Sequence, residues 1–239
     1  AGHPTGNLLI AAMTNITGDF ASAVQKLSEV LKVRGTVLPV SNTPLCLCAE
    51  YDDGTIIQGE SLIPVEDKKI KRVYYTNPDE PALDEAVEAI MEADLVLLGP
   101  GSLYTSIIPN LLLKQIADAV VKTEAQCVYC CNIMTQPGET TGMTASDHVR
   151  VIEEHVGCHI IDKIIVNDES VDDSTYERYT HQNSDMVVID EEVLENMNID
   201  VIKSRLVSYN NVGEVRHNTK KVAATIFSLL LDIEEQREG

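Results

Sequence analysis

The stretch "LVLLGPGSLYTSIIPN", Leu95–Asn110, decides the fold class. Its first four residues are aliphatic, as in strands that a parallel sheet buries on both faces. Gly99-Pro100-Gly101 then predicts a turn, and an apolar pattern with helical spacing begins at Asn110. A strand, a turn and a helix in this order form the repeating unit of α/β proteins. In such proteins ligands bind beyond the carboxyl ends of the strands.

The same alternation continues along the chain on both sides of this stretch. Strands are predicted at residues 36–41, 72–77, 94–99, 126–133, 160–167, 185–190 and 200–207. Helices are predicted at residues 7–15, 19–33, 81–93, 110–123, 145–157 and 222–233, with a short polar helix after the strand at 160–167. We therefore expect an α/β fold with a mostly parallel sheet and helices on both faces.

Residues 44–61 depart from this alternation. Asp53-Gly54 lies between two apolar runs, which predicts a β-hairpin excursion. The chain has no linker rich in Pro or Gly, so residues 1–239 are expected to form a single domain.

The chain is strongly acidic, with 38 Asp and Glu residues against 18 Lys and Arg residues and a formal net charge of −20. A field of this sign repels the phosphates of nucleic acids and anionic lipid head groups, so we expect neither as a partner. No apolar run reaches the roughly 20 residues that a membrane-spanning helix needs. A phosphorylated small molecule would need backbone N–H groups or a well-placed cation to bind.

Cys127 and Cys130 have the Cys-x-x-Cys spacing of redox and zinc sites, but they lie in an apolar strand pattern. Side chains three positions apart on a strand point to opposite faces. We therefore expect buried, reduced thiols, no metal site and a cytoplasmic location.

The glycine turn is a candidate anion site. Gly99 and Gly101 can expose successive N–H groups on one side of the chain. Ser102 and Thr105 add hydroxyl donors, and Tyr104 offers a ring or a phenol at the rim. The turn lacks the full fingerprint of dinucleotide-binding and P-loop proteins, so on its own it favours chain reversal over ligand binding.

The segment after the next predicted strand shifts the balance towards a ligand. It is long and polar, and its Asn132, Thr135 and Thr140 have no evident structural role. Thr144 and Asp147, by contrast, have the spacing of a capping box for the following helix. Two neighbouring polar loops at strand ends predict a cleft for a phosphorylated or sugar-bearing ligand.

Both ends of the sequence add candidates. Asn7 is predicted to cap the first helix, and His3 is a weaker candidate for a ligand contact. Arg216 is the best candidate for the cation that a phosphorylated ligand needs, because a guanidinium can bind a diphosphate through two donors.

Five motifs taken together resemble one known family: "HPTGN", "VLPVSN", "DGTIIQGES", "ADLVLLGPGSLYTSIIPNLL" and "NIMTQPGETTGMTASDHV". In this order they are similar to the family that contains bacterial gluconeogenesis factors and the 2-phospho-L-lactate transferases of coenzyme F420 synthesis. The Met-Thr-Gln-Pro-Gly-Glu-Thr block and "VRHN" resemble the gluconeogenesis-factor branch. The family opens with a strand and a Gly-Gly-Gly-Thr-Gly turn. The resemblance therefore implies that this first strand and turn are missing here.

The resemblance implies a Rossmann-like three-layer sandwich in the cytoplasm that binds a UDP-sugar or an NAD-like dinucleotide. It also implies a role in normal cell shape on gluconeogenic carbon sources. Mg²⁺ is implied only if the protein is a transferase. The ligand-binding positions carried over from the family motifs are Asn7, Gly99, Gly101, Ser102, Leu103, Tyr104, Thr105, Asn132, Met134, Thr135, Thr140 and Arg216.

Three functions stay open at this stage. A nucleotide-sugar-binding regulatory protein is favoured, because the loops hold no evident nucleophile or general base. A transferase that moves a phospho-organic acid from a nucleoside diphosphate carrier to an acceptor alcohol is the alternative. It would need carboxylates for a cation, and only Glu139 and Asp147 are near the loops. The third is a scaffold that binds proteins through its acidic surface. The sequence leaves homo-oligomer formation open.

Overall fold

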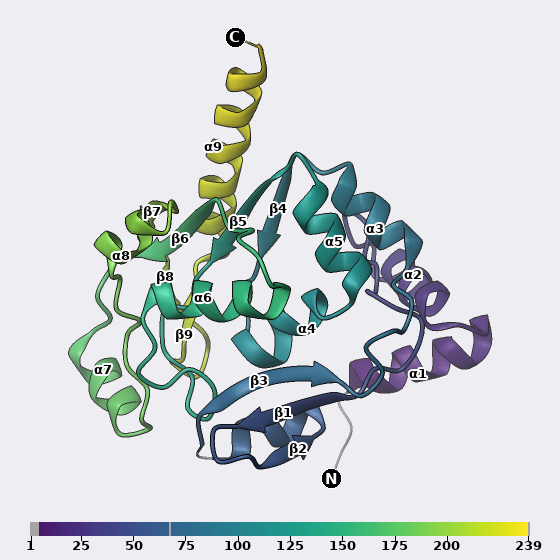
Figure 1. Cartoon of the computed structure of the whole chain (residues 1–239), viewed down its shortest axis with the longest axis horizontal. Helices are drawn as coiled ribbons and strands as arrows, with labels where there is room; N and C mark the ends of the chain where they lie inside the picture. Colours follow the sequence, from purple (N-terminus) through teal and green to yellow (C-terminus); the bar gives the residue numbers. More distant parts are fainter. Residues whose placement is uncertain (1–4, 67, 239) are drawn as a thin grey trace.

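The structure is a computed structural model that describes residues 5–66 and 68–238. Its centre is a parallel sheet in the order β4-β5-β6-β7 (Figure 1). The strands are β4 (Leu95–Leu98), β5 (Gln126–Cys130), β6 (Lys163–Asn167) and β7 (Asp200–Ser204). Each pairs in parallel with the next along the chain, so all four carboxyl ends lie at one edge of the sheet. The predicted parallel sheet is confirmed.

Helices cover both faces of this sheet, which confirms the three-layer α/β arrangement. One face packs against α3 (Asp84–Met91), α5 (Lys114–Lys122), α6 (Ala145–Val156) and α8 (Glu191–Asn196). The other face packs against α9 (Thr219–Glu238) through Val222 and Leu229. The far end of α9 projects beyond the sheet (Figure 1), and Arg237 near that end pairs with Asp94, just before β4.

The two cysteines of the Cys-x-x-Cys spacing point to opposite faces of β5. Cys127 packs in the core on the α5 and α6 side, and Cys130 packs in the core on the α9 side. Both are buried free thiols, and burial raises the pKa of each to about 12. A thiol with such a pKa stays protonated and unreactive at neutral pH, as the strand alternation predicted.

A smaller antiparallel sheet lies apart from the parallel one, at the bottom of Figure 1. Its strands are β1 (Leu47–Tyr51), β2 (Ile56–Gln58) and β3 (Ile70–Tyr75), in the order β2-β1-β3. Gly54, with φ +82°, makes the tight turn between β1 and β2. A short 3₁₀-helix, η1 (Glu60–Val65), follows β2.

Two hydrogen bonds join the small sheet to the helices beside the large one. The Tyr75 hydroxyl donates to the Pro109 carbonyl over 3.1 Å, which ties β3 to α4 (Ile108–Leu111). The Val73 N–H donates to Nε2 of His155 on α6 over 3.0 Å. These contacts fix the small sheet beside the loops that follow β4 and β5.

The chain between β4 and α5 differs from the prediction of one helix at 110–123. A π-helical turn, η2 (Leu103–Ile107), leads into α4, and α5 begins only at Lys114. The capping box of α6 is confirmed. The Thr144 hydroxyl accepts from the Asp147 N–H, and the Asp147 carboxylate accepts from the Thr144 N–H.

Two predicted strands are wrong. Residues 36–41 form an irregular segment instead, held where the Leu83 N–H donates to the Val40 carbonyl. Residues 185–190 make only isolated bridges to the loop after β5, pairing Met186 with Met134 and Val188 with Thr144. The apolar residues Leu38, Val40, Val187 and Ile189 pack partly buried against the main core, and periodicity cannot distinguish such packing from a sheet.

The end of the sheet also differs from the prediction of one strand at 200–207. β7 ends at Ser204, and the chain then forms an antiparallel hairpin of β8 (Val207–Tyr209) and β9 (Val215–His217). The predicted polar helix is α7 (Asp173–Thr180).

The first two helices are α1 (Thr5–Thr17) and α2 (Phe20–Val30). Asp19 caps α2 by accepting from the Ser22 N–H. The predicted cap at Asn7 is wrong, because α1 starts before it and Asn7 is an exposed residue inside the helix. Across residues 5–66 and 68–238, no helix combines the length and apolar character needed to cross a bilayer.

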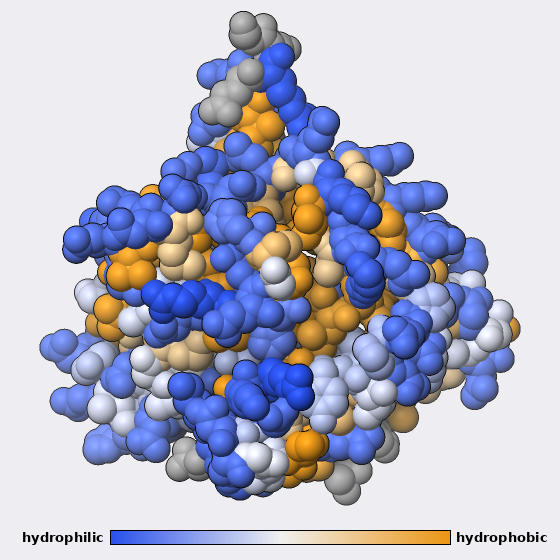
Figure 2. Space-filling model, in the orientation of Figure 1, coloured by the Kyte–Doolittle hydropathy of each residue, from blue (hydrophilic) through white to orange (hydrophobic). Residues whose placement is uncertain are grey.

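Figure 2 shows a mostly hydrophilic surface with several orange, apolar areas, of which the most extended lies where Figure 1 places β4, α4 and α5. β4 is the edge strand of the large sheet, and three of its four residues are only half-buried. Hydrophilic residues, in blue, surround this area on the same face.

Candidate ligand-binding site

A cavity of about 780 Å³ lies at the carboxyl edge of the parallel sheet. The loops after β4 and β5 form one side, and α7 and the β8–β9 hairpin form the other. Of the predicted positions, those that line it are Gly101, Ser102, Asn132, Met134, Thr135 and Arg216. The two predicted loops and the predicted cation therefore do meet in one place.

The loops after β4 and β5 are tied together by side-chain amides. The Asn132 Nδ2 donates to the Gly101 carbonyl over 2.9 Å, and the Gln136 Nε2 lies 2.9 Å from the Ser102 Oγ. Gly99 lets the turn after β4 lie close to the end of β5. Its φ is +84°, and a Cβ there would lie 3.1 Å from the Cys130 carbonyl oxygen. Gly99 thus packs the turn closely against β5, and it is not among the residues that line the cavity.

The N–H groups after the turn are not all free for an anion. The Tyr104 N–H donates to Oε2 of Glu139 over 3.0 Å, and the Thr105 hydroxyl donates to its Oε1 over 2.9 Å. A carboxylate of the protein itself therefore occupies part of the predicted anion site. The sequence offered Glu139 only as a cation ligand.

Several predicted ligand contacts hold the loops instead of lining the cavity. Leu103 and Tyr104 are buried in the core. Thr140 is fully buried, and its hydroxyl accepts from the Gln136 N–H over 2.8 Å. The Thr135 hydroxyl accepts from the Asp185 N–H over 2.9 Å, although Thr135 still borders the cavity.

Asn7 on α1 is not among the residues that line the cavity, and His3 lies outside the described residues.

The far side of the cavity adds residues that sequence reasoning missed. Tyr179 on α7 is half-buried, and its hydroxyl accepts from the Val215 N–H over 2.9 Å. Gln182 and Ser184 follow it along the cavity wall. The available signal was an aromatic residue in a short polar helix beyond a strand end. That signal is weak, because nothing in the sequence places α7 opposite the loop after β5.

β9 supplies two neighbouring side chains to the cavity. Arg216 is exposed and forms an ion pair with Glu214. The Nε2 of His217 lies 3.0 Å from the Cys131 carbonyl oxygen. Burial lowers the pKa of His217 below its ordinary value, so the imidazole is neutral at neutral pH.

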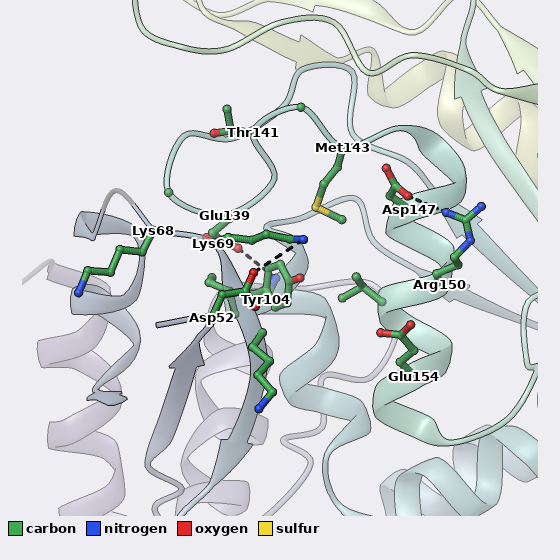
Figure 3. Close-up of a pocket in the computed structure, with 15 residues that line it drawn as sticks. Asp52, Lys68, Lys69, Tyr104, Glu139, Thr141, Met143, Asp147, Arg150 and Glu154 are labelled. Carbon is green, nitrogen blue, oxygen red and sulfur yellow. Dashed lines mark hydrogen bonds and ion pairs between the residues drawn. The ribbon is translucent and has the colours of Figure 1, made fainter. Parts of the chain in front are cut away.

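A second cavity, of about 650 Å³, lies on the other side of the loop after β5 (Figure 3). Charged residues of both signs line it, and several are paired with each other: Lys69 with Asp52, and Arg150 with Asp147. Gln136 and Pro137 line the first cavity, whereas Gly138 and Glu139 line the second. Residues 136–139 therefore form a wall between the two cavities.

We expect Glu139→Gln to change how stability depends on pH. Burial raises the pKa of the Glu139 carboxyl above its ordinary 4.5. The folded protein then binds more protons than the unfolded chain between these two pKa values, so the wild type loses stability as pH rises through this window. Glutamine does not titrate, and the Thr105 hydroxyl can turn to accept from it.

Urea unfolding of the wild type and Glu139→Gln between about pH 4 and pH 8 measures how the free energy of unfolding of each protein depends on pH. The wild type should lose stability relative to Glu139→Gln as pH rises. Glu154→Gln is the control, because it removes a carboxylate from the same cavity without touching Tyr104 or Thr105. If the free energies of unfolding of the wild type and Glu139→Gln differed by the same amount at every pH, Glu139 would not be desolvated.

Comparison with known proteins places the chain in a family. The sequence model of the family described as "2-phospho-L-lactate transferase CofD" matches residues 1–207. The chain belongs to the CofD family. The match includes both loops of the first cavity, whereas Arg216 and His217 lie beyond it.

Relatives within the CofD family are bacterial gluconeogenesis factors. The "Gluconeogenesis factor" of Bacillus subtilis (strain 168) is 48% identical over 229 residues, which is 96% of this chain and 72% of the relative. The "Gluconeogenesis factor" of Listeria innocua is 40% identical over 238 residues, which is 100% of this chain and 73% of the relative. This second match includes the β8–β9 hairpin.

A solved structure of a similar protein has the same fold. It is the crystal structure of a UPF0052 family member from Bacillus halodurans, 46% identical, with a TM-score of 0.90 over 95% of this chain and 73% of that chain. The predicted resemblance to gluconeogenesis factors is confirmed, and so is the Rossmann-like α/β fold.

Proposed function

We propose that this protein is a regulatory protein of the gluconeogenesis-factor type that binds a nucleotide sugar, of the UDP-sugar class, in the cavity beside Arg216. The observation that carries the proposal is the composition of this cavity. It joins an exposed arginine, a half-buried tyrosine ring and several amide and hydroxyl groups. A diphosphate, a base and sugar hydroxyls have the matching chemistry.

Charge supports Arg216 as the phosphate contact. The protein carries a net charge of −20, so a diphosphate needs a local cation. Arg216 borders the cavity, and its planar guanidinium can donate two parallel hydrogen bonds to phosphate oxygens. Its ion pair with Glu214 is exposed and therefore weak enough to exchange for a ligand.

Tyr179 supports a nucleobase in the same cavity. Its hydroxyl is held by the Val215 N–H, so the orientation of the ring is fixed before any ligand arrives. A fixed aromatic ring can stack on a base at low entropic cost. The cavity volume of about 780 Å³ lies within the range of small-molecule sites.

The names of the relatives support a role in gluconeogenic growth. We extend the proposal to normal cell shape on gluconeogenic carbon sources and to the cytoplasm, where free thiols such as Cys127 and Cys130 persist.

Isothermal titration calorimetry with UDP-N-acetylglucosamine tests the proposal. We expect saturable binding, with weaker binding of UDP alone and of NAD. The absence of heat at millimolar ligand would remove the proposal, and tighter binding of NAD would replace the sugar nucleotide with a dinucleotide.

A transferase is the second candidate, and the description of the family favours it. It would move a phospho-organic acid from a nucleoside diphosphate to an acceptor alcohol. The names of the relatives favour the first candidate, because relatives that match most of this chain are called gluconeogenesis factors. Product formation by the purified protein with Mg²⁺ and candidate donors would decide for the transferase.

A further inference from the structure

The amide of Asn132 has a fixed orientation. Its Nδ2 lies 2.9 Å from the Gly101 carbonyl oxygen. A carbonyl can only accept, so the amide must direct its NH₂ group at Gly101. The Oδ1 of Asn132 is then the atom that remains for other partners, and it can only accept. Asn132 is half-buried and lines the cavity beside Arg216.

The imidazole of His217 has a fixed tautomer for the same reason. Its Nε2 lies 3.0 Å from the Cys131 carbonyl oxygen, so Nε2 carries the hydrogen. In a neutral ring the other nitrogen, Nδ1, is an acceptor. Burial lowers the pKa of His217, which keeps the ring neutral at neutral pH. His217 also lines the cavity.

The two acceptors belong to one local unit. Cys131 and Asn132 are consecutive residues just after β5. The backbone carbonyl of Cys131 accepts from His217, and the side-chain amide of Asn132 donates to the Gly101 carbonyl. Both side chains use their N–H groups on the backbone. The cavity therefore pairs an arginine that can only donate with two atoms, Asn132 Oδ1 and His217 Nδ1, that can only accept.

We propose that Asn132 Oδ1 and His217 Nδ1 form an acceptor pair that binds hydroxyl groups of a sugar in this cavity. The inference rests on the proposed function and assigns the sugar part of the ligand to these two residues. Phosphate oxygens carry no hydrogen at neutral pH, so their lone pairs would meet the lone pairs of the acceptor pair. Sugar hydroxyls can donate to both atoms, while Arg216 binds the diphosphate.

Two near-isosteric variants of His217 separate an acceptor role from a bracing role. In His217→Asn the amide oxygen can occupy the place of Nδ1, which keeps the acceptor but loses the contact with Cys131. In His217→Gln the amide nitrogen can occupy the place of Nε2, which keeps that contact but loses the acceptor. We expect His217→Asn to bind UDP-N-acetylglucosamine nearly as the wild type does and His217→Gln to bind about tenfold more weakly.

Calorimetric titration of the wild type and both variants gives this comparison, with thermal melting as the check on folding. Loss of binding in His217→Asn, alone or together with His217→Gln, would overturn the inference, because bracing by Cys131 would then explain the role of His217. Unchanged binding in His217→Gln would overturn it too. If the wild type binds neither UDP nor UDP-N-acetylglucosamine, the proposed function itself fails.

The ligand can be varied instead of the protein, which keeps the inference testable if a variant does not fold. Fluorine cannot donate a hydrogen bond, so UDP-glucose with single hydroxyls replaced by fluorine should bind the wild type about tenfold more weakly at one position at least. Equal affinity for every analogue would overturn the inference. Titrations with UDP alone show which of the two sugars of the ligand is bound, because UDP carries only the ribose. If His217→Gln also binds UDP more weakly than the wild type does, the hydroxyl groups belong to the ribose.

Discussion

Gly138→Ala is expected to lower the free energy of unfolding by at least about 3 kcal/mol, the largest effect on stability that we predict. Gly138 has φ +78°, a conformation that costs other residues energy. Its ideal Cβ would also overlap the carbonyl oxygen of Pro64 and lie 2.9 Å from the carbonyl carbon. Pro64 belongs to η1, so the loop after β5 would have to move away from the small sheet.

Gly142→Ala is the matched control. Gly142 lies in the same loop at φ +73°, but no atom comes within 4 Å of its ideal Cβ. It should cost only the conformational penalty, about 1 kcal/mol. Urea unfolding of both variants isolates the steric part as their difference. Equal stability of the two variants would show that the loop does not rest on η1.

Arg216→Ala is expected to weaken UDP-N-acetylglucosamine binding by about ten- to a hundredfold, the largest effect on affinity that we predict. The loss follows from removing charge-assisted hydrogen bonds to the diphosphate in a protein of net charge −20. Arg216→Lys should recover part of the affinity, because an ammonium supplies the charge without the planar pair of donors. Calorimetry measures all three proteins.

Arg72→Ala controls for the change in net charge. The Arg72 side chain is 61% exposed and pairs with Glu50, while that of Arg216 is 62% exposed and pairs with Glu214. Arg72 lies on β3, and the first cavity does not include it. If Arg72→Ala weakened binding as much as Arg216→Ala, the effect would come from overall charge, and the site would lose its assigned cation.

The sequence predicted the parallel sheet because strands such as Leu95–Leu98 and Gln126–Cys130 are short, mainly apolar and separated by helical patterns. It failed at 36–41 and 185–190, where apolar residues pack against the main core but the segments join neither sheet. Local pattern reports burial, and only tertiary contacts decide whether a buried segment joins a sheet.

For the candidate site, the sequence predicted both loops and Arg216, which line one cavity, but not the contacts that hold them. Glu139 is remote from Tyr104 in the sequence, so nothing local indicates that its carboxylate accepts from the Tyr104 N–H and the Thr105 hydroxyl. Tyr179 reaches the cavity because α7 lies beside the β8–β9 hairpin, where the Tyr179 hydroxyl accepts from the Val215 N–H. Both contacts join residues that are far apart in the sequence. Residue type and local spacing therefore do not predict them.

Residues 136–139, the wall between the two cavities, hold the chain after β4 through contacts on both sides. Gln136 faces one cavity and contacts Ser102, while Glu139 borders the other and contacts Tyr104 and Thr105. Both residues therefore hold the start of η2, Gln136 beside the first cavity and Glu139 beside the second. Free-energy changes from substitutions at these two positions should not add, because each variant alters the support on which the other acts. A double-mutant cycle across the wall will measure coupling rather than two independent contributions.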